Sequence, residues 1–432
     1  MNNKIPKGYK KTDIGIIPED WEVKRLGDDF VIQGGPFGSS IKSEFLGKRG
    51  IPIYSSINVI SGDFTPKYFL DKKYYKNLKQ FTIKKGDLLL TTRGTVGIAK
   101  IFANKLKTGI IHSNLTIIRP SKQIDLKYLE YIFSFPVIKK QIESLFAQTT
   151  INALYSSHIK SFLIPLPPLP EQKAIARILS DIDELIENIS LLIEKKKLIK
   201  KGVMQQLLTG KKRLPGFKSK WVKKRLGEVV YFLKGKGLSK EKLSPKGKYE
   251  CILYGELFTT YKEIIKEIKS KTNYKEGIPS VKGDILIPAS TTTTGIDLAK
   301  ASAIIKNDVL LGGDINILRK KTTELDSIFL AYYLNEDKKQ EIAEKTAGIT
   351  IYHLHGKDLI DIEIFYPPTL AEQKAIAQVL SDMDAEIEAL ERKKQKYEMI
   401  KKGMMELLLT GKVRVREENG KIKRIGGIGA IK

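Results

Sequence analysis

The side chains best suited to binding a polyanion include a short stretch in which basic and aromatic residues alternate. Lys67, Lys72, Lys73, Tyr74 and Tyr75 make up this stretch. Lysines can bind phosphates while a tyrosine ring or hydroxyl contacts a sugar or base. A solvated strand and turn of the same composition would bind nothing, and the residues alone leave both interpretations open.

A second candidate is the loop after the apolar strand at 87–90, where Thr91 and Thr92 precede Arg93 and a glycine. An arginine can donate two hydrogen bonds to one guanine, and hydroxyls can reach other base edges. A structural ion pair for Arg93 fits the sequence equally well. The corresponding loop in the second half of the chain offers hydroxyl and methyl groups without charge: Thr291, Thr292, Thr293 and Thr294. If both loops read bases, the two halves must prefer different sequences.

The sequence contains no constellation suited to catalysis or metal binding. A single cysteine, Cys251, excludes a disulfide framework and a cysteine-based zinc site, and the chain has only 4 histidines. Glu171 superficially resembles a nuclease carboxylate, but it opens a long helix, and its copy in the second repeat does the same. A negative charge in the first turn of a helix therefore explains it better. We therefore expect a non-catalytic protein with no cofactor and no metal of its own.

The chain is strongly basic, with 76 Lys and Arg against 49 Asp and Glu, a net charge of +27. This excess favours nucleic acid as the partner over an acidic membrane surface. Residues 1–160 carry 26 basic and 13 acidic side chains, so the excess lies mainly on the globular parts. A thermophilic or AT-rich genome would also produce lysine-rich proteins. Without an apolar leader or a long apolar run, we expect no membrane span and a cytoplasmic location.

The candidate residues belong to a duplicated chain. Residues 171–213 align without a gap with residues 372–414 at an offset of 201, and 24 of the 43 positions are identical. Upstream, the Trp-to-Gly segment 21–27 corresponds to 221–227. This period is too long for a solenoid, whose repeats run about 20–50 residues. The chain therefore holds two whole domains, each followed by its own helix.

The residues between these landmarks have diverged. Segments 28–164 and 228–364 share only echoes, such as 86–90 against 283–287. A duplicated scaffold with different contents is expected when two similar readers recognise two different targets. Short strand signals mixed with helical stretches predict an α+β fold for each domain.

The repeated blocks predict two long helices that form a coiled coil. Glycines 210 and 411 are placed as C-caps, and prolines precede each block. Apolar residues follow a heptad seam in the first block: Ile175, Ile178, Ile182, Leu185, Ile189, Leu192, Ile199 and Val203. The second block continues the pattern with Ile376, Val379, Met383, Leu390, Tyr397, Ile400 and Met404. Ordinary core helices are the alternative, but about 39 residues is far above the usual length of about 11–12.

The lengths of these helices predict how they pair. A helix of about 39 residues spans roughly 58 Å, whereas a domain of about 150 residues has a radius of gyration near 15 Å. The second domain cannot carry the chain back, so we expect an antiparallel pair with the domains at opposite ends, related by an approximate two-fold axis. On DNA, such a ruler would present two half-sites separated by an unread spacer.

Three motifs together resemble the specificity subunit of type I restriction-modification systems. They are the opening 8–10 through 21–27, the run Pro-Leu-Pro-Pro-Leu-Pro-Glu-Gln-Lys-Ala-Ile-Ala at 165–176, and the Leu-Leu-Thr-Gly-Lys helix ends. The resemblance covers essentially the whole chain, in the right order and twice over. One extra residue before Glu372 is a small departure from the pattern.

The resemblance implies two pseudo-two-fold-related α/β target recognition domains separated by antiparallel coiled-coil helices. It divides the chain into target recognition domain 1 (1–164), a central helix (165–213), target recognition domain 2 (214–364), a C-terminal helix (365–415) and a flexible basic tail (416–432). The implied partners are double-stranded DNA, two methyltransferase subunits and restriction subunits, with S-adenosylmethionine and ATP/Mg used only by those subunits. A coiled-coil scaffold that tethers two binding modules to non-nucleic-acid partners is the alternative.

Overall fold

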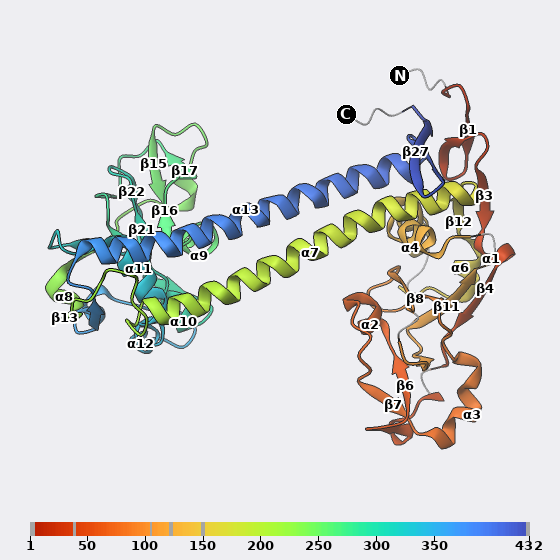
Figure 1. Ribbon diagram of the computed structural model, residues 1–432, viewed down its shortest axis with the longest axis horizontal. Helices are drawn as coiled ribbons and strands as arrows, with labels where there is room; N and C mark the ends of the chain where they lie inside the picture. Colours follow the sequence, from red (N-terminus) through yellow and green to blue (C-terminus); the bar gives the residue numbers. More distant parts are fainter. Residues whose placement is uncertain (1–4, 38–39, 104–105, 121–123, 148–151, 429–432) are drawn as a thin grey trace. The chain divides into compact units, whose positions relative to one another are not determined.

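The computed structural model describes residues 5–37, 40–103, 106–120, 124–147 and 152–428. The chain forms two compact units: unit 1 consists of residues 1–188 and 394–432, and unit 2 of residues 189–393. Each unit mixes helices and strands, which confirms the α+β prediction (Figure 1). Both long helices contribute one part to each unit.

Two sheets form the body of unit 1. An antiparallel sheet has the order β4-β11-β8-β9, and a mixed sheet has the order β10-β6-β7-β5. Strand β12 pairs with β3, and β1 with β2. The strands are β1 (Tyr9–Thr12), β2 (Gly15–Pro18), β3 (Glu22–Arg25), β4 (Phe30–Gly34), β5 (Leu46–Gly47), β6 (Ile51–Tyr54), β7 (Tyr68–Leu70), β8 (Leu88–Thr91), β9 (Ala99–Ile101), β10 (Ile110–Ile111), β11 (Leu115–Pro120) and β12 (Leu163–Leu166).

Short helices connect these strands. They are α1 (Leu26–Asp29), α2 (Ser56–Ser61), α3 (Tyr75–Leu78), α4 (Leu126–Ser134), α5 (Pro136–Phe146) and α6 (Ser156–Ser161), with 3-10 turns η2 (Ser43–Phe45), η3 (Lys72–Tyr74) and η4 (Lys79–Phe81). Helix α4 begins where the Asp125 carboxylate accepts a hydrogen bond from the backbone N–H of Tyr128 at 2.9 Å. This cap fixes the start of the helix that joins the domain to the long helices.

Unit 2 repeats this plan with additions. Its larger sheet has the order β14-β23-β19-β21-β16 and its smaller sheet β17-β15-β22-β18, while β13 pairs with β25 and β20 with β24. The strands are β13 (Val222–Arg225), β14 (Val230–Lys234), β15 (Tyr249–Ile252), β16 (Ile264–Ile265), β17 (Ser270–Thr272), β18 (Ile278–Pro279), β19 (Ile285–Pro288), β20 (Ser290–Thr291), β21 (Ser302–Ile304), β22 (Leu310–Leu311), β23 (Ile315–Lys320), β24 (Tyr352–His353) and β25 (Glu363–Tyr366). Its shorter helices are α8 (Leu226–Val229), α9 (Tyr254–Thr259), α10 (Gly295–Leu298), α11 (Ser327–Glu336) and α12 (Lys339–Glu344), with turns η5 (Lys240–Lys242) and η6 (Gly356–Leu359).

The two long helices are α7 (Leu169–Leu207) and α13 (Leu370–Leu408), each of 39 residues, as predicted. They run antiparallel within each unit. In unit 1, Glu171 near the start of α7 bonds Arg414 just beyond α13, while Asp183 pairs with Lys401. In unit 2 the residue numbers of the ion pairs again rise along one helix as they fall along the other, so the two helices are antiparallel there too (Figure 1).

The main core of each unit combines a domain with two helix ends. In unit 1, Ile175 and Leu179 of α7 pack in the same cluster as Leu408, the last residue of α13. In unit 2, Leu207 of α7 and Ile376 of α13 share the cluster of the second domain. Because both helix ends lie in these cores, the hydrophobic effect fastens the helix pair to each domain.

The predicted seam shifts register along α7. Ile175 and Ile189 are buried, as expected, but Leu192 is 40% exposed and its neighbour Ile193 is buried instead. A straight α-helix drifts about 20° per heptad from a 3.5-residue repeat, so the buried face moves along by one position after a few turns. In α13, Ile387 is buried where the heptad position would hold Glu386.

The C-terminal segment forms a hairpin, so the prediction of a flexible tail is wrong for residues 416–426. Strands β26 (Arg414–Glu418) and β27 (Lys421–Gly426) are paired, and Val415 is buried in the core of unit 1. The turn is Asn419-Gly420, and both residues have positive φ angles. An Asn-Gly pair between two strands is the usual signal of a type I′ hairpin.

Candidate nucleic-acid interface

The loop after β8 presents one of its three candidate side chains to solvent. Thr91 and Thr92 are 0% and 3% exposed. The Thr91 hydroxyl accepts a hydrogen bond from the backbone N–H of Ile98 at 3.0 Å, and therefore shapes the turn between β8 and β9. Both threonines are thus buried, whereas the sequence prediction placed them among the side chains that read bases.

Arg93 is exposed, and its backbone bridges to Ala153. Among the residues that the structure describes, no carboxylate lies within ion-pair distance of its guanidinium, which disfavours the structural ion pair. The nearby His112 has a lowered pKa because it is partly buried, and the charge of Arg93 adds to this effect. Within the described residues, the guanidinium therefore keeps its hydrogen-bond donors available to a ligand.

The basic and aromatic stretch flanks strand β7 of the second sheet of unit 1 and is partly structural. The Tyr74 ring stacks on Phe45 at 3.9 Å between centroids, and the Lys73 ammonium lies over the Tyr74 ring, 4.8 Å from its centre. The Tyr75 hydroxyl is 2.9 Å from that of Thr82. Both tyrosines are half-buried, whereas the lysines point outward: Lys67, Lys72 and Lys73. The lysines remain candidates for phosphate contacts.

The threonine loop of unit 2 uses most of its hydroxyls internally. Thr293 and Thr294 donate hydrogen bonds to the Asp297 carboxylate at 2.6 and 2.7 Å, and these bonds lower the pKa of Asp297. The hydroxyl of Thr291 lies 2.9 Å from that of Thr293. Thr292 is exposed, and within unit 2, which is described throughout, its side chain has no hydrogen-bond partner. It is the member of this set most available to a base.

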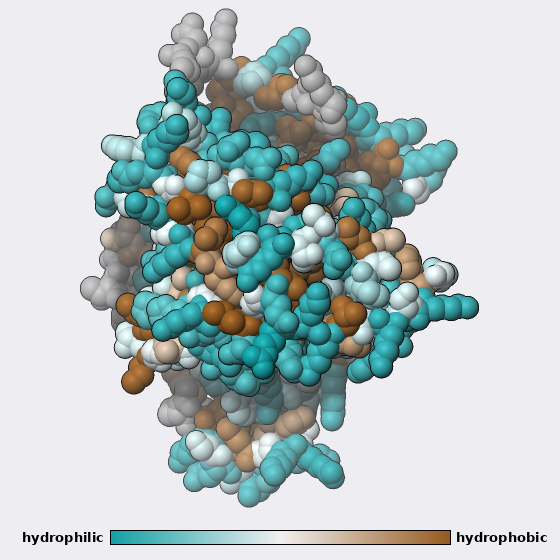
Figure 2. Space-filling view, turned by 90° about the vertical axis from the view of Figure 1, so that its left-hand side faces the viewer, coloured by the Kyte–Doolittle hydropathy of each residue, from teal (hydrophilic) through white to brown (hydrophobic). Residues whose placement is uncertain are grey.

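A cavity of about 940 Å³ lies beside this loop in unit 2. Its walls carry Thr291, Thr293 and six lysines, namely Lys197, Lys200, Lys201, Lys262, Lys300 and Lys339. Some of the lysines are paired with carboxylates, but Lys201 and Lys339 form no ion pair with any described residue. The side of unit 2 that faces the viewer in Figure 2 is covered largely by hydrophilic side chains. A polyanion could bind the unpaired lysines.

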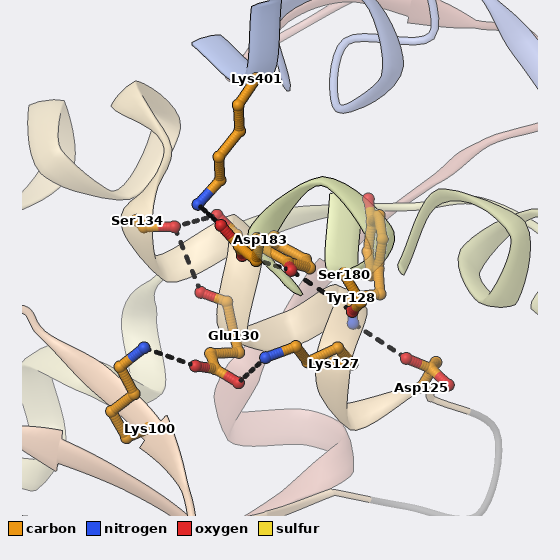
Figure 3. Close-up of polar contacts among 10 residues, drawn as sticks. Lys100, Asp125, Lys127, Tyr128, Glu130, Ser134, Ser180, Asp183 and Lys401 are labelled. Carbon is orange, nitrogen blue, oxygen red and sulfur yellow. Dashed lines mark hydrogen bonds and ion pairs between the residues drawn. The ribbon is translucent and has the colours of Figure 1, made fainter. Parts of the chain in front are cut away.

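A Tyr–Asp–Lys cluster joins domain 1 to both long helices. The Asp183 carboxylate of α7 accepts a hydrogen bond from the Tyr131 hydroxyl of α4 at 2.7 Å and pairs with Lys401 of α13 at 2.5 Å. Figure 3 shows Lys401 reaching from its helix toward Asp183. Burial of Tyr131, together with the Asp183 carboxylate, raises the pKa of Tyr131 well above its usual value. The hydroxyl therefore stays protonated and acts as a hydrogen-bond donor.

The same cluster recurs in unit 2 with the helices exchanged. Tyr332 of α11 donates to Asp384 of α13 at 2.6 Å, and Lys200 of α7 pairs with Asp384 at 2.6 Å. Each of these residues differs by 201 in number from its counterpart in unit 1. In both clusters the lysine comes from the helix of the other repeat.

A buried Trp–Glu–Arg cluster closes each unit. In unit 1, Glu171 is 2% exposed and accepts hydrogen bonds from the Trp21 indole at 3.0 Å and from the Arg414 guanidinium at 2.7 and 2.8 Å. Asp20 also binds Arg414, at 2.7 Å. Burial would lower the pKa of Arg414, but the hydrogen bonds to Glu171 and Asp20 outweigh it and raise that pKa.

The counterpart in unit 2 consists of Trp221, Glu372 and Arg213. The Arg213 guanidinium donates two hydrogen bonds to the fully buried Glu372, and the Trp221 indole donates a third at 3.4 Å. Glu171 is therefore more than a first-turn charge, which the sequence interpretation missed. The exact recurrence of tryptophan, glutamate and arginine in both repeats was the available signal.

The glutamine that follows each glutamate ties the domain to its helix. The Gln172 side chain accepts a hydrogen bond from the N–H of Asp125 and donates one to the carbonyl of Pro167. Gln373 makes the matching bonds to Asp326 and Pro367. The Pro-Pro and Glu-Gln motifs are thus adjacent because they build one joint.

Comparison with known proteins identifies the class of this chain. The model of the family described as type I restriction modification DNA specificity domain matches residues 18–196 and 218–399. The chain belongs to this family. It is a type I restriction-modification specificity subunit.

Relatives of known sequence match nearly the whole chain. The protein described as the specificity subunit of the type I restriction enzyme MjaX, from Methanocaldococcus jannaschii, is 31% identical over 95% of this chain and 97% of its own length. The MjaVIII specificity subunit of the same organism is 29% identical over 93% of this chain and 95% of its own.

Solved structures share the fold at lower identity. The S subunit of the type I restriction-modification system from M. genitalium has a TM-score of 0.58 and 18% identity, covering 94% of this chain and 97% of that one. A chain from a structure on assembly and conformational transition of the type I R-M system has a TM-score of 0.54 and 19% identity, covering 91% and 99%.

Two kinds of feature are absent from the described residues. No described helix has the length and apolar content needed to cross a membrane. No group of three or more histidine, cysteine, aspartate or glutamate side chains in the described ranges could hold a metal ion.

Proposed function

We propose that the chain reads a bipartite DNA sequence, with one recognition domain for each half-site, and that it has no catalytic activity itself. One observation carries this proposal: both units share the same supporting clusters, while the loops after β8 and β19 differ. The first loop exposes an arginine that pairs with no carboxylate among the described residues, and the second loop exposes a threonine. Arginine favours guanine, and a threonine methyl favours thymine, so the half-sites would differ.

Affinity would come mainly from lysines that bind phosphates. Lys67 and Lys72 in unit 1, and Lys201 and Lys339 in unit 2, are the candidates, since they form no ion pair with the described residues. Phosphate contacts release counterions, so binding that uses about 6–10 of them weakens by about 10³–10⁵ between 50 and 200 mM salt. The alternative, a tether for non-nucleic-acid partners, predicts no such dependence on DNA or salt.

Methyltransferase subunits would dock on apolar residues of the long helices. Leu198 and Ile199 of α7 are 70% and 44% exposed, and their counterparts Met399 and Ile400 of α13 are 70% and 37% exposed. These pairs differ by 201 in number, so each unit offers one equivalent apolar pair. Contiguous exposed apolar surface marks interaction sites, and we take each pair as the centre of such a contact. Two equivalent pairs match two methyltransferase subunits.

Catalysis would reside in the partner subunits. S-adenosylmethionine would bind the methyltransferase subunits, and ATP with Mg would serve restriction subunits in the same complex. The specificity subunit would contribute the target, and the continuous helices α7 and α13 would set the spacing between half-sites.

Methylation sequencing tests this proposal directly. The host methyltransferase subunits are produced in cells without other DNA methylation, with and without the full-length chain. We expect methylated adenines in a split motif with a fixed gap only when the chain is present. The same methylation pattern with and without the chain would overturn the proposal.

A further inference from the structure

The Tyr–Asp–Lys clusters differ from the other contacts between domain and helices. Each carboxylate, Asp183 or Asp384, lies between a domain tyrosine and a lysine of the opposite helix. One side chain therefore joins three chain segments. The apolar contacts nearby resist separation of these segments, but they tolerate sliding because the hydrophobic effect has no direction. A hydrogen bond to a charged group is directional, so it resists rotation.

The clusters are partly shielded from solvent: the Lys401 and Asp183 side chains of unit 1 are 28% and 38% exposed, and the pair in unit 2 is less exposed. Lys200 and Asp384 side chains are 12% and 18% exposed, and the Lys200 ammonium also lies 5.2 Å from the centre of the Tyr332 ring. In unit 1 the Lys401 ammonium is 5.5 Å from the centre of the Tyr131 ring. Partly buried ion pairs are screened less by salt than exposed ones. The same geometry occurs in both units although the domains have diverged.

A small rotation at this joint would matter for reading DNA. A domain of this size has a radius of gyration near 15 Å, and successive base pairs are about 3.4 Å apart. Rotation by about 13° about the joint would therefore move a recognition loop by about one base pair along DNA. A joint that prevents this rotation would fix the distance between half-sites.

We propose that the two Tyr–Asp–Lys clusters lock the angle of each recognition domain on the helix pair and so restrict the spacer to one length. Tyr131, Asp183 and Lys401 are positioning residues in unit 1, and Tyr332, Asp384 and Lys200 are their counterparts. This inference rests on the proposed bipartite function, and it adds a determinant of spacing outside the loops and apart from helix length.

The test compares Tyr131→Phe with Tyr128→Phe. Both tyrosines lie on α4, and both substitutions remove one hydroxyl while keeping the ring. The Tyr128 hydroxyl donates to the carbonyl of Pro165 in β12, which precedes α7, and the repeat has phenylalanine at the matching position 329. Tyr128→Phe is therefore a matched control that leaves the joint to the helices intact.

The full-length chain in complex with methyltransferase subunits is offered DNA duplexes that carry both half-sites with spacers of different length. We expect the wild type and Tyr128→Phe to select one length. Tyr131→Phe should lose about tenfold in its discrimination against adjacent lengths, the size of one hydrogen bond to a charged group. The preferred bases of each half-site should not change. Tyr332→Phe should broaden the spacer in the same way.

The outcomes separate this inference from the proposed function. If the wild type selects no bipartite target, the proposed function fails. If the wild type selects one spacer and Tyr131→Phe selects it as sharply, the inference fails alone. Equal broadening by Tyr128→Phe would also overturn it, because loss of stability would then be the cause. The melting temperatures of both variants are measured in parallel.

Discussion

Units 1 and 2 agree in their supports and differ in their exposed loops. Both contain a Trp–Glu–Arg cluster, a Tyr–Asp–Lys cluster and a glutamine that joins domain to helix. The loop after β8 exposes an arginine, whereas the loop after β19 leads into threonines that mostly bond one another or Asp297. The comparison teaches that the supports are constrained by burial while the loops are free to change specificity.

The two units also close differently. The guanidinium of Arg414 in unit 1 binds both Glu171 and Asp20, and the β26–β27 hairpin follows it. In unit 2, Glu372 is the one carboxylate that pairs with Arg213 among the described residues, and the position matching Asp20 holds Lys220. Equivalent substitutions of Glu171 and Glu372 should therefore reduce the stability of units 1 and 2 by unequal amounts.

The largest expected effect is on the Trp–Glu–Arg clusters. Glu372→Gln leaves Arg213 without a carboxylate, so we expect a loss of about 3–5 kcal/mol in the stability of unit 2. Glu171→Gln should cost less in unit 1, because Asp20 still pairs with Arg414. Both losses of stability are measured by denaturant unfolding, with limited proteolysis as the probe of unfolding in each unit. Equal losses in the two units would contradict the asymmetry. Glu171→Gln in an Asp20→Asn background should destabilise unit 1 as much as Glu372→Gln destabilises unit 2.

A smaller effect is expected on recognition. Arg93→Ala should weaken binding by about 1–3 kcal/mol if the guanidinium reads a base, and should relax the first half-site alone. Thr292→Ala should affect only the second half-site, and by less, since it removes no charge. Sequencing of bound DNA from a random library measures both. An unchanged motif for Arg93→Ala would make this arginine a surface residue without a role in recognition.

The smallest expected effect is on phosphate contacts. Lys201→Ala should weaken binding uniformly across DNA sequences and reduce the salt slope by about 1. Lys197, which pairs with Glu391 at 3.0 Å, offers a control on the same helix. Titrations at several salt concentrations compare the two alanine variants. A sequence-dependent loss for Lys201→Ala would show that it reads a base instead.

The sequence predicted the elements that repeat. Both 39-residue helices, their glycine ends and their antiparallel pairing follow from the duplicated blocks and from chain geometry. The Asn419-Gly420 hairpin was also readable from its turn residues, but its basic and glycine-rich composition favoured a flexible segment instead.

The exposure of candidate site residues could not be predicted in the same way. Thr91 ends strand β8 and Thr92 lies between it and Arg93, yet both threonines are buried while the arginine is exposed. Glu171 was assigned to the helix dipole because its partners, Trp21 and Arg414, lie 150 and 243 residues away in the chain. Residue types indicate what a side chain can bind, but tertiary packing decides which of them a ligand can reach.

The most direct test of the central claim is the DNA motif selected by a chimaera. Residues 28–164 are replaced by those of a related specificity subunit that retains the tyrosine of the first Tyr–Asp–Lys cluster, and the full-length complex selects DNA from a random library. We predict a motif in which one half-site changes while the other half-site and the gap stay the same. A change in both half-sites, or in neither, would contradict the account.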